Sequence, residues 1–140
     1  MSQLTKLRED HIKLAKMFLQ LERTIARPDP PSQLELFQFR HDLMTTVIGH
    51  LKLEDWALYP RLIESGDEEI SAKGRWFKEE MGGLAPVFVE YCDKWTASSI
   101  PADWSGYCSD TRRILEALTD RLRRENHDLL PLLERLDRAA

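Results

Sequence analysis

The chain has little of what several large classes of protein depend on. Only two of its 140 residues are cysteines, Cys92 and Cys108, so neither a disulfide framework nor a paired CxxC metal site is expected. No apolar run approaches the ~20 residues that span a bilayer, and the N-terminus lacks the apolar stretch of a signal peptide. The formal net charge is −4, with basic residues scattered among acidic ones, which disfavours nucleic acid as a partner. We therefore expect a cytoplasmic protein that binds neither membrane nor nucleic acid.

Strand patterns are lacking as well, because no stretch alternates convincingly between apolar and polar residues. Glycine and proline instead divide the chain into four segments whose apolar residues recur at helical spacing, about 4–26, 32–64, 68–96 and 108–138. A length of 140 residues suits one domain with a single core, residues 1–140. The sequence therefore predicts an all-α fold, an up-down-up-down antiparallel four-helix bundle.

Several residues predict irregularities within and between these segments. Pro60 and Pro131 fall inside periodic stretches, so we expect local bends there and no termination. The stretch "MGG" (81–83) should loosen or kink the third segment midway. Between the third and fourth segments, "ASSIPADWSG" (97–106) is expected to be a linker. It would either pack across the end of the bundle, with Trp104 as an anchor, or form part of a dimer contact.

Polar residues interrupt the apolar stripes of three segments: His11 in the first, His50 and Glu54 one turn apart in the second, Arg121 and Glu125 one turn apart in the fourth. A buried carboxylate is costly unless it is paired with a cation or bound to a metal. Two neutral imidazoles and two carboxylates would offer a divalent ion four ligands and cancel its charge, a mixture suited to iron, manganese or zinc. The candidate metal ligands are therefore His11, His50, Glu54 and Glu125.

Each of these residues also has a plainer interpretation when taken alone. A single histidine on an apolar face is more often a hydrogen-bonded core residue than a ligand, and the spacing HxxxE occurs on helices by accident. Only the joint placement on three inward faces favours a metal site. By contrast, a ~100° step per residue turns His41, His127 and Trp56 away from the apolar stripes, so we expect all three at the surface.

Two stretches of the chain echo one another. When "HLKLEDWALYPRL" (50–62) is laid over "RLRRENHDLLPLL" (121–133), the two candidate glutamate ligands coincide and the two prolines coincide. At the first position, however, His50 meets Arg121. One copy of the pattern thus opens with a potential metal ligand and the other with a permanent cation, which has no lone pair for a metal.

These stretches, together with "REDHIKL", resemble the hemerythrin-like (HHE cation-binding) family over about residues 4–136. The resemblance implies an up-down-up-down four-helix bundle whose core holds a non-haem di-iron site. It also implies a function in binding oxygen or in responding to oxygen, iron or redox state. The family pattern is a histidine in the first helix, HxxxE in the second, one or two histidines in the third and HxxxE in the fourth, with two carboxylates bridging the metals.

Carried over residue by residue, the resemblance implies that His11 and His50 serve one metal and that Glu54 and Glu125 are the bridging pair. The ligands of the other metal are missing. Met81 stands where the third helix should supply a histidine, and no histidine occurs between His50 and His127. Some relatives add a carboxylate directly after the second-helix histidine, where this chain has Leu51. One half of the site is retained and the other is lost.

Arg121 occupies the position of the missing fourth-helix histidine. We hypothesise that its guanidinium faces the interior, pairs with Glu125 and Glu54, and replaces one iron ion with a fixed cation. The alternative is that Arg121 extends to the surface and pairs there with an acid such as Asp120 or Glu125.

Two outcomes for the chemistry are open. Either one iron, manganese or zinc ion remains, or Arg121 neutralises the carboxylates so well that no metal binds, and we favour the second because three ligand positions are lost together. In both cases a regulatory or sensing protein is expected in place of an oxygen carrier, with a mononuclear metal protein of redox or oxygen-related role as the alternative. A protein partner, and a monomer or homodimer, are compatible with this view. We expect no enzyme, because no nucleophile–base pair or phosphate loop is visible.

Overall fold

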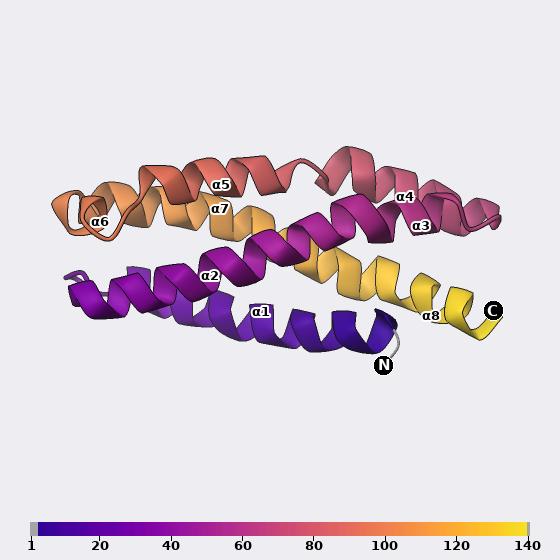
Figure 1. Ribbon diagram of the computed structural model, residues 1–140, viewed down its shortest axis with the longest axis horizontal. Helices are drawn as coiled ribbons and strands as arrows, with labels where there is room; N and C mark the ends of the chain where they lie inside the picture. The colour runs from indigo at the N-terminus through magenta and orange to yellow at the C-terminus, as the bar shows by residue number, and fades with distance from the viewer. Residues whose placement is uncertain (1–2, 140) are drawn as a thin grey trace.

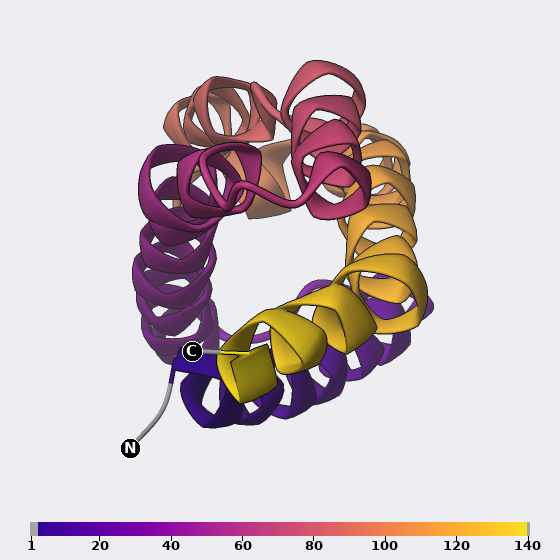
Figure 2. The same cartoon turned by 90° about the vertical axis from the view of Figure 1, so that its right-hand side faces the viewer.

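Residues 3–139 of the chain are described by a computed structural model, and every secondary-structure element among them is a helix. The helices lie along one long axis (Figure 1), and an end-on view shows them surrounding a common interior (Figure 2). Helix α1 packs against α2 and α7, and α5 packs against α2 and α7. The elements are α1 (Gln3–Ile25), α2 (Gln33–Leu53), η1 (Glu54–Leu58), α3 (Tyr59–Ile63), α4 (Glu68–Met81), α5 (Leu84–Lys94), α6 (Ser99–Ala102), α7 (Trp104–Arg124), η2 (Glu125–Leu129) and α8 (Leu130–Ala139).

The first two helical segments begin and end close to where the sequence predicts. Helix α1 stops just before "RPDPP", which cannot continue a helix. Ser32 caps α2, because its side-chain oxygen accepts a hydrogen bond from the Glu35 amide at 3.3 Å. Among the described residues, no helix is long and apolar enough to cross a membrane.

Short π-helical turns precede the two prolines of the echoed stretches. The turn η1 runs from Glu54 to Leu58, two residues before Pro60, and η2 runs from Glu125 to Leu129, two residues before Pro131. Proline has no amide to donate, and its ring crowds the carbonyl four residues earlier, so a wider turn relieves the conflict without ending the helix. The predicted bends are therefore confirmed as π turns, and each begins at one of the buried glutamates.

The third segment is fully interrupted, which goes further than the predicted kink. Helix α4 ends at Met81 and α5 begins at Leu84. Gly83 has φ of +80°, a left-handed conformation that a side chain disfavours. A Cβ atom on Gly82 would lie 2.3 Å from the Lys78 carbonyl oxygen. The two glycines thus allow a sharp break at the level of the polar interior residues.

The predicted linker is wrong in its conformation. Residues Ser99–Ala102 form the short helix α6, and α7 begins at Trp104, four residues earlier than predicted. Asp103 caps α7 by accepting a hydrogen bond from the Gly106 amide at 3.0 Å, a signal that was overlooked beside the proline and serine residues. Trp104 Nε1 donates to the Arg27 carbonyl at 3.1 Å, so it does anchor this end of the molecule, as expected.

The core consists of two apolar clusters separated by a polar layer. One contains Leu14, Phe18, Val47, Leu118 and other residues toward the α6 end, and the second contains Leu7, Leu58, Phe77, Leu129 and others toward the opposite end. Along α1, α2 and α7 the polar interior residues fall where one cluster gives way to the next. As predicted, His41, His127 and Trp56 are exposed.

Candidate metal centre

Five polar side chains meet in the layer between the two apolar clusters: His11 from α1, His50 from the end of α2, Glu54 from the start of η1, Arg121 from the last turn of α7, and Glu125 from the start of η2. None is more than 6% exposed. The helical spacing of three and four residues turns them inward together with the neighbouring leucines, as the sequence predicts. All four candidate ligands are therefore in one place.

The imidazole Nε2 atoms converge on a single carboxylate oxygen. Nε2 of His50 lies 3.0 Å from Oε2 of Glu54, and Nε2 of His11 lies 3.3 Å from the same oxygen. Nε2 of His11 also lies 3.4 Å from Oε1 of Glu125. One ligand atom from each of the four residues falls within 4.8 Å of all the others. Ligands at ~2.1 Å from one ion lie at most ~4.2 Å apart, so a small contraction would complete a coordination sphere.

The opposite ring nitrogens face oxygen acceptors outside this cluster. Nδ1 of His11 lies 2.6 Å from Oδ1 of Asn126, and Nδ1 of His50 lies 3.5 Å from Oδ2 of Asp10. At His11 this is the pattern around metal-ligating histidines, whose second ring nitrogen donates to an outer oxygen and so turns the first toward the metal. Among the described residues, neither nitrogen of His50 has a partner in hydrogen-bond geometry, although the ring is buried. The donor set therefore fits one metal ion.

Arg121 faces the interior and is 2% exposed, which confirms the inward hypothesis and excludes the surface alternative. Its Nη2 donates to Oε1 of Glu54 at 2.9 Å and to Oδ1 of Asp55 at 3.0 Å. Its Nη1 donates to the main-chain carbonyl of Met81 at 2.9 Å, and its Nε lies 3.6 Å from Oε2 of Glu125. One guanidinium thus gathers oxygen atoms from three helical segments, as a metal ion would.

Each buried glutamate divides its two oxygens between the histidines and the arginine. Oε2 of Glu54 faces the histidines while Oε1 binds Arg121. Oε1 of Glu125 faces His11, while its Oε2 faces Arg121 and accepts a hydrogen bond from the Tyr59 hydroxyl. Both carboxylates therefore bridge two positive positions, one at the imidazoles and one at the guanidinium. Arg121 stands at the second position.

The carboxylates around Arg121 outnumber its charge, which leaves negative charge for a metal ion to neutralise. Three carboxylates, those of Glu54, Asp55 and Glu125, surround the single positive charge of Arg121, which leaves two negative charges. One divalent cation would neutralise them, as would two protonated imidazoles.

The titration behaviour follows from the same contacts. Burial disfavours the charged form of His11, but hydrogen bonds with Glu125 and Glu54 outweigh it and raise its pKa to about 10. Burial also opposes ionisation of Glu54, yet its contacts with the two histidines and Arg121 hold its pKa well below the usual range. The pKa of Glu125 is raised, first by burial and then by the negative charge of Glu54. Without a metal, the cluster is thus stabilised by an imidazolium at His11.

Four side chains of this site were missed by reasoning from the sequence: Asp10, Asp55, Asn126 and Tyr59. The first three have a common signal, because each is the direct chain neighbour of a predicted ligand. Such a neighbour lies ~100° round the helix from the ligand and is therefore easily taken for a surface residue. Their outer contacts link α1, α2 and the fourth segment around the site.

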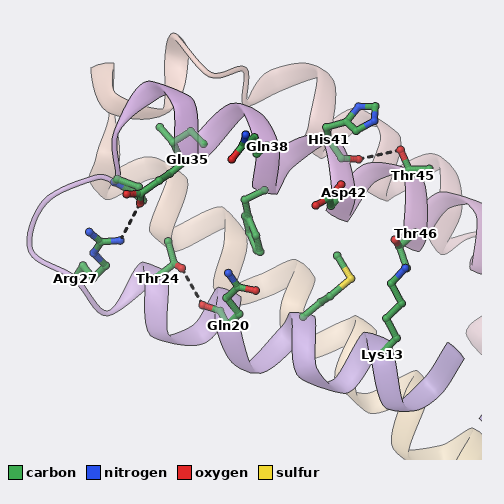
Figure 3. A pocket seen from close by; sticks show the side chains of 14 residues that line it. Lys13, Gln20, Thr24, Arg27, Glu35, Gln38, His41, Asp42, Thr45 and Thr46 are labelled. Atoms are coloured by element: carbon green, nitrogen blue, oxygen red, sulfur yellow. Dashed lines mark hydrogen bonds and ion pairs between the residues drawn. The ribbon is translucent and has the colours of Figure 1, made fainter. Parts of the chain in front are cut away.

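The cavity at the site is small, and the large surface groove lies elsewhere on the molecule. A cavity of about 10 Å³, close to the volume that one water-sized probe needs, is lined by His50, Glu54, Arg121 and Glu125 together with apolar residues. A much larger groove of about 740 Å³ lies between α1 and α2 (Figure 3), where Lys13 of α1 extends toward Thr46 of α2 and His41 lies on the rim. The groove residues do not include the four candidate ligands.

Comparison with known proteins adds one finding. The family model of the hemerythrin HHE cation binding domain matches residues 2–133, which is most of the chain. No curated protein and no solved structure gives a significant match.

Proposed function

Because the chain belongs to the hemerythrin HHE cation-binding domain family, we propose that it is an up-down-up-down four-helix bundle with a degenerate, one-metal centre and a regulatory or sensing role. One divalent ion, iron, manganese or zinc, would be held by His11, His50, Glu54 and Glu125. Arg121 takes the place of the second ion. The bound ion would supply a single Lewis-acid centre in an otherwise closed core.

The orientation of the two histidines carries this proposal. Both Nε2 atoms point at Oε2 of Glu54, and both Nδ1 atoms point at outer oxygens of Asn126 and Asp10. A histidine that only filled the core would satisfy both nitrogens by hydrogen bonds, whereas His50 has neither satisfied among the described residues. This observation favours one bound metal ion over a metal-free core.

Oxygen carriage is not the proposed role. Reversible binding of oxygen by a hemerythrin centre draws two electrons from two irons, and the guanidinium of Arg121 supplies none. Catalysis is not proposed either, because Cys92 and Cys108 are buried and burial raises the pKa of both thiols, which makes them poor nucleophiles. We propose instead a cytoplasmic protein, monomer or homodimer, whose metal state is communicated to a protein partner.

Metal analysis of the purified protein tests the proposal. After growth in medium supplied with iron, manganese and zinc, we expect about one equivalent of bound metal, and this metal should be lost from the His50→Ala variant. His127→Ala is the matched control, because His127 is exposed and lies outside the site. Metal content near zero in the wild-type protein would refute the metal centre.

That outcome would favour a metal-free interaction module on the same bundle. The contacts of His11 support this second function: hydrogen bonds with Glu125 and Glu54 raise its pKa, so an imidazolium there would compensate part of the carboxylate charge. Restoring histidine at Met81 and Arg121 tests the half-site directly, because it returns two missing ligands and removes the competing cation. We expect the double variant to bind two equivalents of iron, whereas a variant that still binds one would contradict the role of Arg121 as the substitute ion.

A further inference from the structure

The break between α4 and α5 is connected to the metal centre by one hydrogen bond. Nη1 of Arg121 donates to the carbonyl of Met81, the last residue of α4, while Nη2 of the same guanidinium donates to Glu54. We propose that Arg121 couples metal occupancy of the centre to the conformation of the α4–α5 junction (residues 81–84), which is where the metal state is communicated to the surface. This coupling rests on the proposed one-metal function.

The junction has the structure of a hinge that the Arg121 side chain supports from the interior. The last carbonyls of a helix have no partner within the helix, and Arg121 supplies a donor for the one at Met81. Beyond it, Gly82 is extended and Gly83 is left-handed, so the chain leaves α4 through two residues without side chains. The Gly82 amide donates to the Phe77 carbonyl at 3.0 Å and closes the last turn of α4. The stability of this turn therefore depends on where the guanidinium lies.

The Glu54 side chain contacts both the guanidinium of Arg121 and the proposed position of the metal ion. Its Oε1 binds Arg121 and its Oε2 faces the two histidines, where the ion would bind. An ion at Oε2 draws negative charge away from the Arg121 contact, and the two cations repel each other across a buried carboxylate. The guanidinium then relies more on its remaining acceptors, which are the Met81 carbonyl and Asp55. Metal binding should therefore tighten the junction.

The junction leads directly to an exposed surface. Leu84 and Val87, in the first turn of α5, line a hollow of about 350 Å³ together with residues of α7, and Val87 is 51% exposed. A change in how firmly α5 is held at its first turn alters this apolar surface without any metal ligand reaching the solvent. Through this coupling, metal binding in the buried centre would change the exposed surface around Leu84 and Val87.

Amide hydrogen exchange of the wild-type protein, chelator-treated or loaded with one equivalent of Zn²⁺, tests the coupling. We expect exchange in the segment 77–84 to slow by about threefold or more with zinc, while the segment 99–106 at the far end is unchanged. Zinc stoichiometry is measured on the same samples. If zinc binds and the segment 77–84 exchanges at the same rate, the coupling is refuted and the metal centre stands. If no zinc binds, the proposed function fails, and the coupling fails with it.

A matched pair of glycine variants tests the coupling from the opposite end. Gly83 and Gly66 have φ of +80° and +83°, and an added Cβ on either meets nothing within 4 Å, so alanine strains both loops alike. Coupling between two sites is reciprocal, so Gly83→Ala should weaken zinc affinity by about threefold although Gly83 contacts no ligand. Gly66→Ala should leave it unchanged. Equal zinc affinities in the two variants would overturn the coupling.

Arg121→Lys keeps the positive charge but removes the simultaneous contacts with Glu54 and the Met81 carbonyl. Lysine keeps a cation in the core, but its single ammonium group lacks the planar fork that reaches Glu54 and the Met81 carbonyl together. We expect this variant to bind zinc while the segment 77–84 no longer responds. Arg123→Lys, at an exposed arginine two residues later on α7, is the control that should respond as the wild type does. A full response in Arg121→Lys would show that the guanidinium does not carry the coupling.

Discussion

Replacing Arg121 with glutamine is the most direct perturbation of this core. Glutamine keeps a polar side chain of moderate length but removes the positive charge. The carboxylates of Glu54 and Glu125, each at most 1% exposed, then face one another with His11 as the main compensating cation. The protein must protonate a carboxylate, admit a metal ion or lose stability.

The expected loss can be worked out from the contacts of the guanidinium. Breaking a buried ion pair by removing one partner typically costs ~3–5 kcal/mol, because the remaining charge stays buried. Unfolding entropy of ~2.1 cal/mol/K per residue gives ~0.29 kcal/mol/K for a chain of 140 residues. The variant should therefore melt ~10–17 °C below the wild type when both are metal-free, a large part of the ~5–15 kcal/mol that stabilises a typical domain.

The assay is thermal and urea denaturation of Arg121→Gln beside Arg124→Gln. Arg124 forms an exposed ion pair with Asp120, whose loss should cost less than ~1 kcal/mol. Arg121 lowers the pKa of both buried glutamates in the folded protein, so its removal should raise these pKa values, and the loss of stability should shrink as the pH falls and grow as it rises. Zinc should stabilise the variant more than the wild type. A loss below ~1 kcal/mol at neutral pH would refute the view that Arg121 compensates the buried carboxylates.

Three further predictions concern other parts of the site and the fold. Because the pKa of His11 is raised to about 10, a zinc ion must displace its proton, and zinc affinity should rise with pH by up to ~tenfold per pH unit below that value. Titration calorimetry in buffers of different ionisation enthalpy should detect the released proton. A zinc affinity that does not change with pH would contradict this prediction. Tyr59→Phe should cost ~1–3 kcal/mol in urea denaturation, because Glu125 loses its buried donor, and an unchanged midpoint would show that the bond contributes nothing. Gly49→Ala should stabilise the protein by ~0.5–1 kcal/mol, because this mid-helix glycine has nothing within 4 Å of an added Cβ; destabilisation would indicate a contact absent from the structure.

Helical periodicity predicts the helical segments well because the apolar stripe is a local property of the sequence. The end of α1 follows from such a stripe and the prolines after it, and the starts of α2 and α4 lie at their capping residues Ser32 and Asp67. The early start of α7 was missed because proline and serine dominate the preceding stretch, while the decisive signal is a single aspartate at its N-cap, Asp103. Caps depend on one hydrogen bond and are easily outweighed by composition.

In the site, too, the sequence reveals residues that are marked by their own helix and misses those that depend on contacts with another helix. His50 and Glu54 are detectable because polar residues on an apolar stripe are costly and therefore demand a partner. Asp10 and Asn126 are not detectable in this way, because each is partly accessible and completes its role only across the bundle, on the histidine of another helix. The sequence could likewise place Arg121 on the inward face but could not reveal that its partner from the third segment is a main-chain carbonyl.

The contacts of Arg121 explain why several features of the core occur together. If a neutral residue stood at position 121, Glu54 and Glu125 would share a buried space with too little positive charge. Arginine restores one charge permanently, but a guanidinium presents several donors and needs several acceptors, and the carboxylates alone do not satisfy them. Asp55 and the Met81 carbonyl supply the others, and that carbonyl is free to bond because Gly82 and Gly83 end α4 at this level. The break between α4 and α5 and the buried arginine are thus connected, because the two glycines free a main-chain carbonyl and that carbonyl satisfies one donor of the guanidinium.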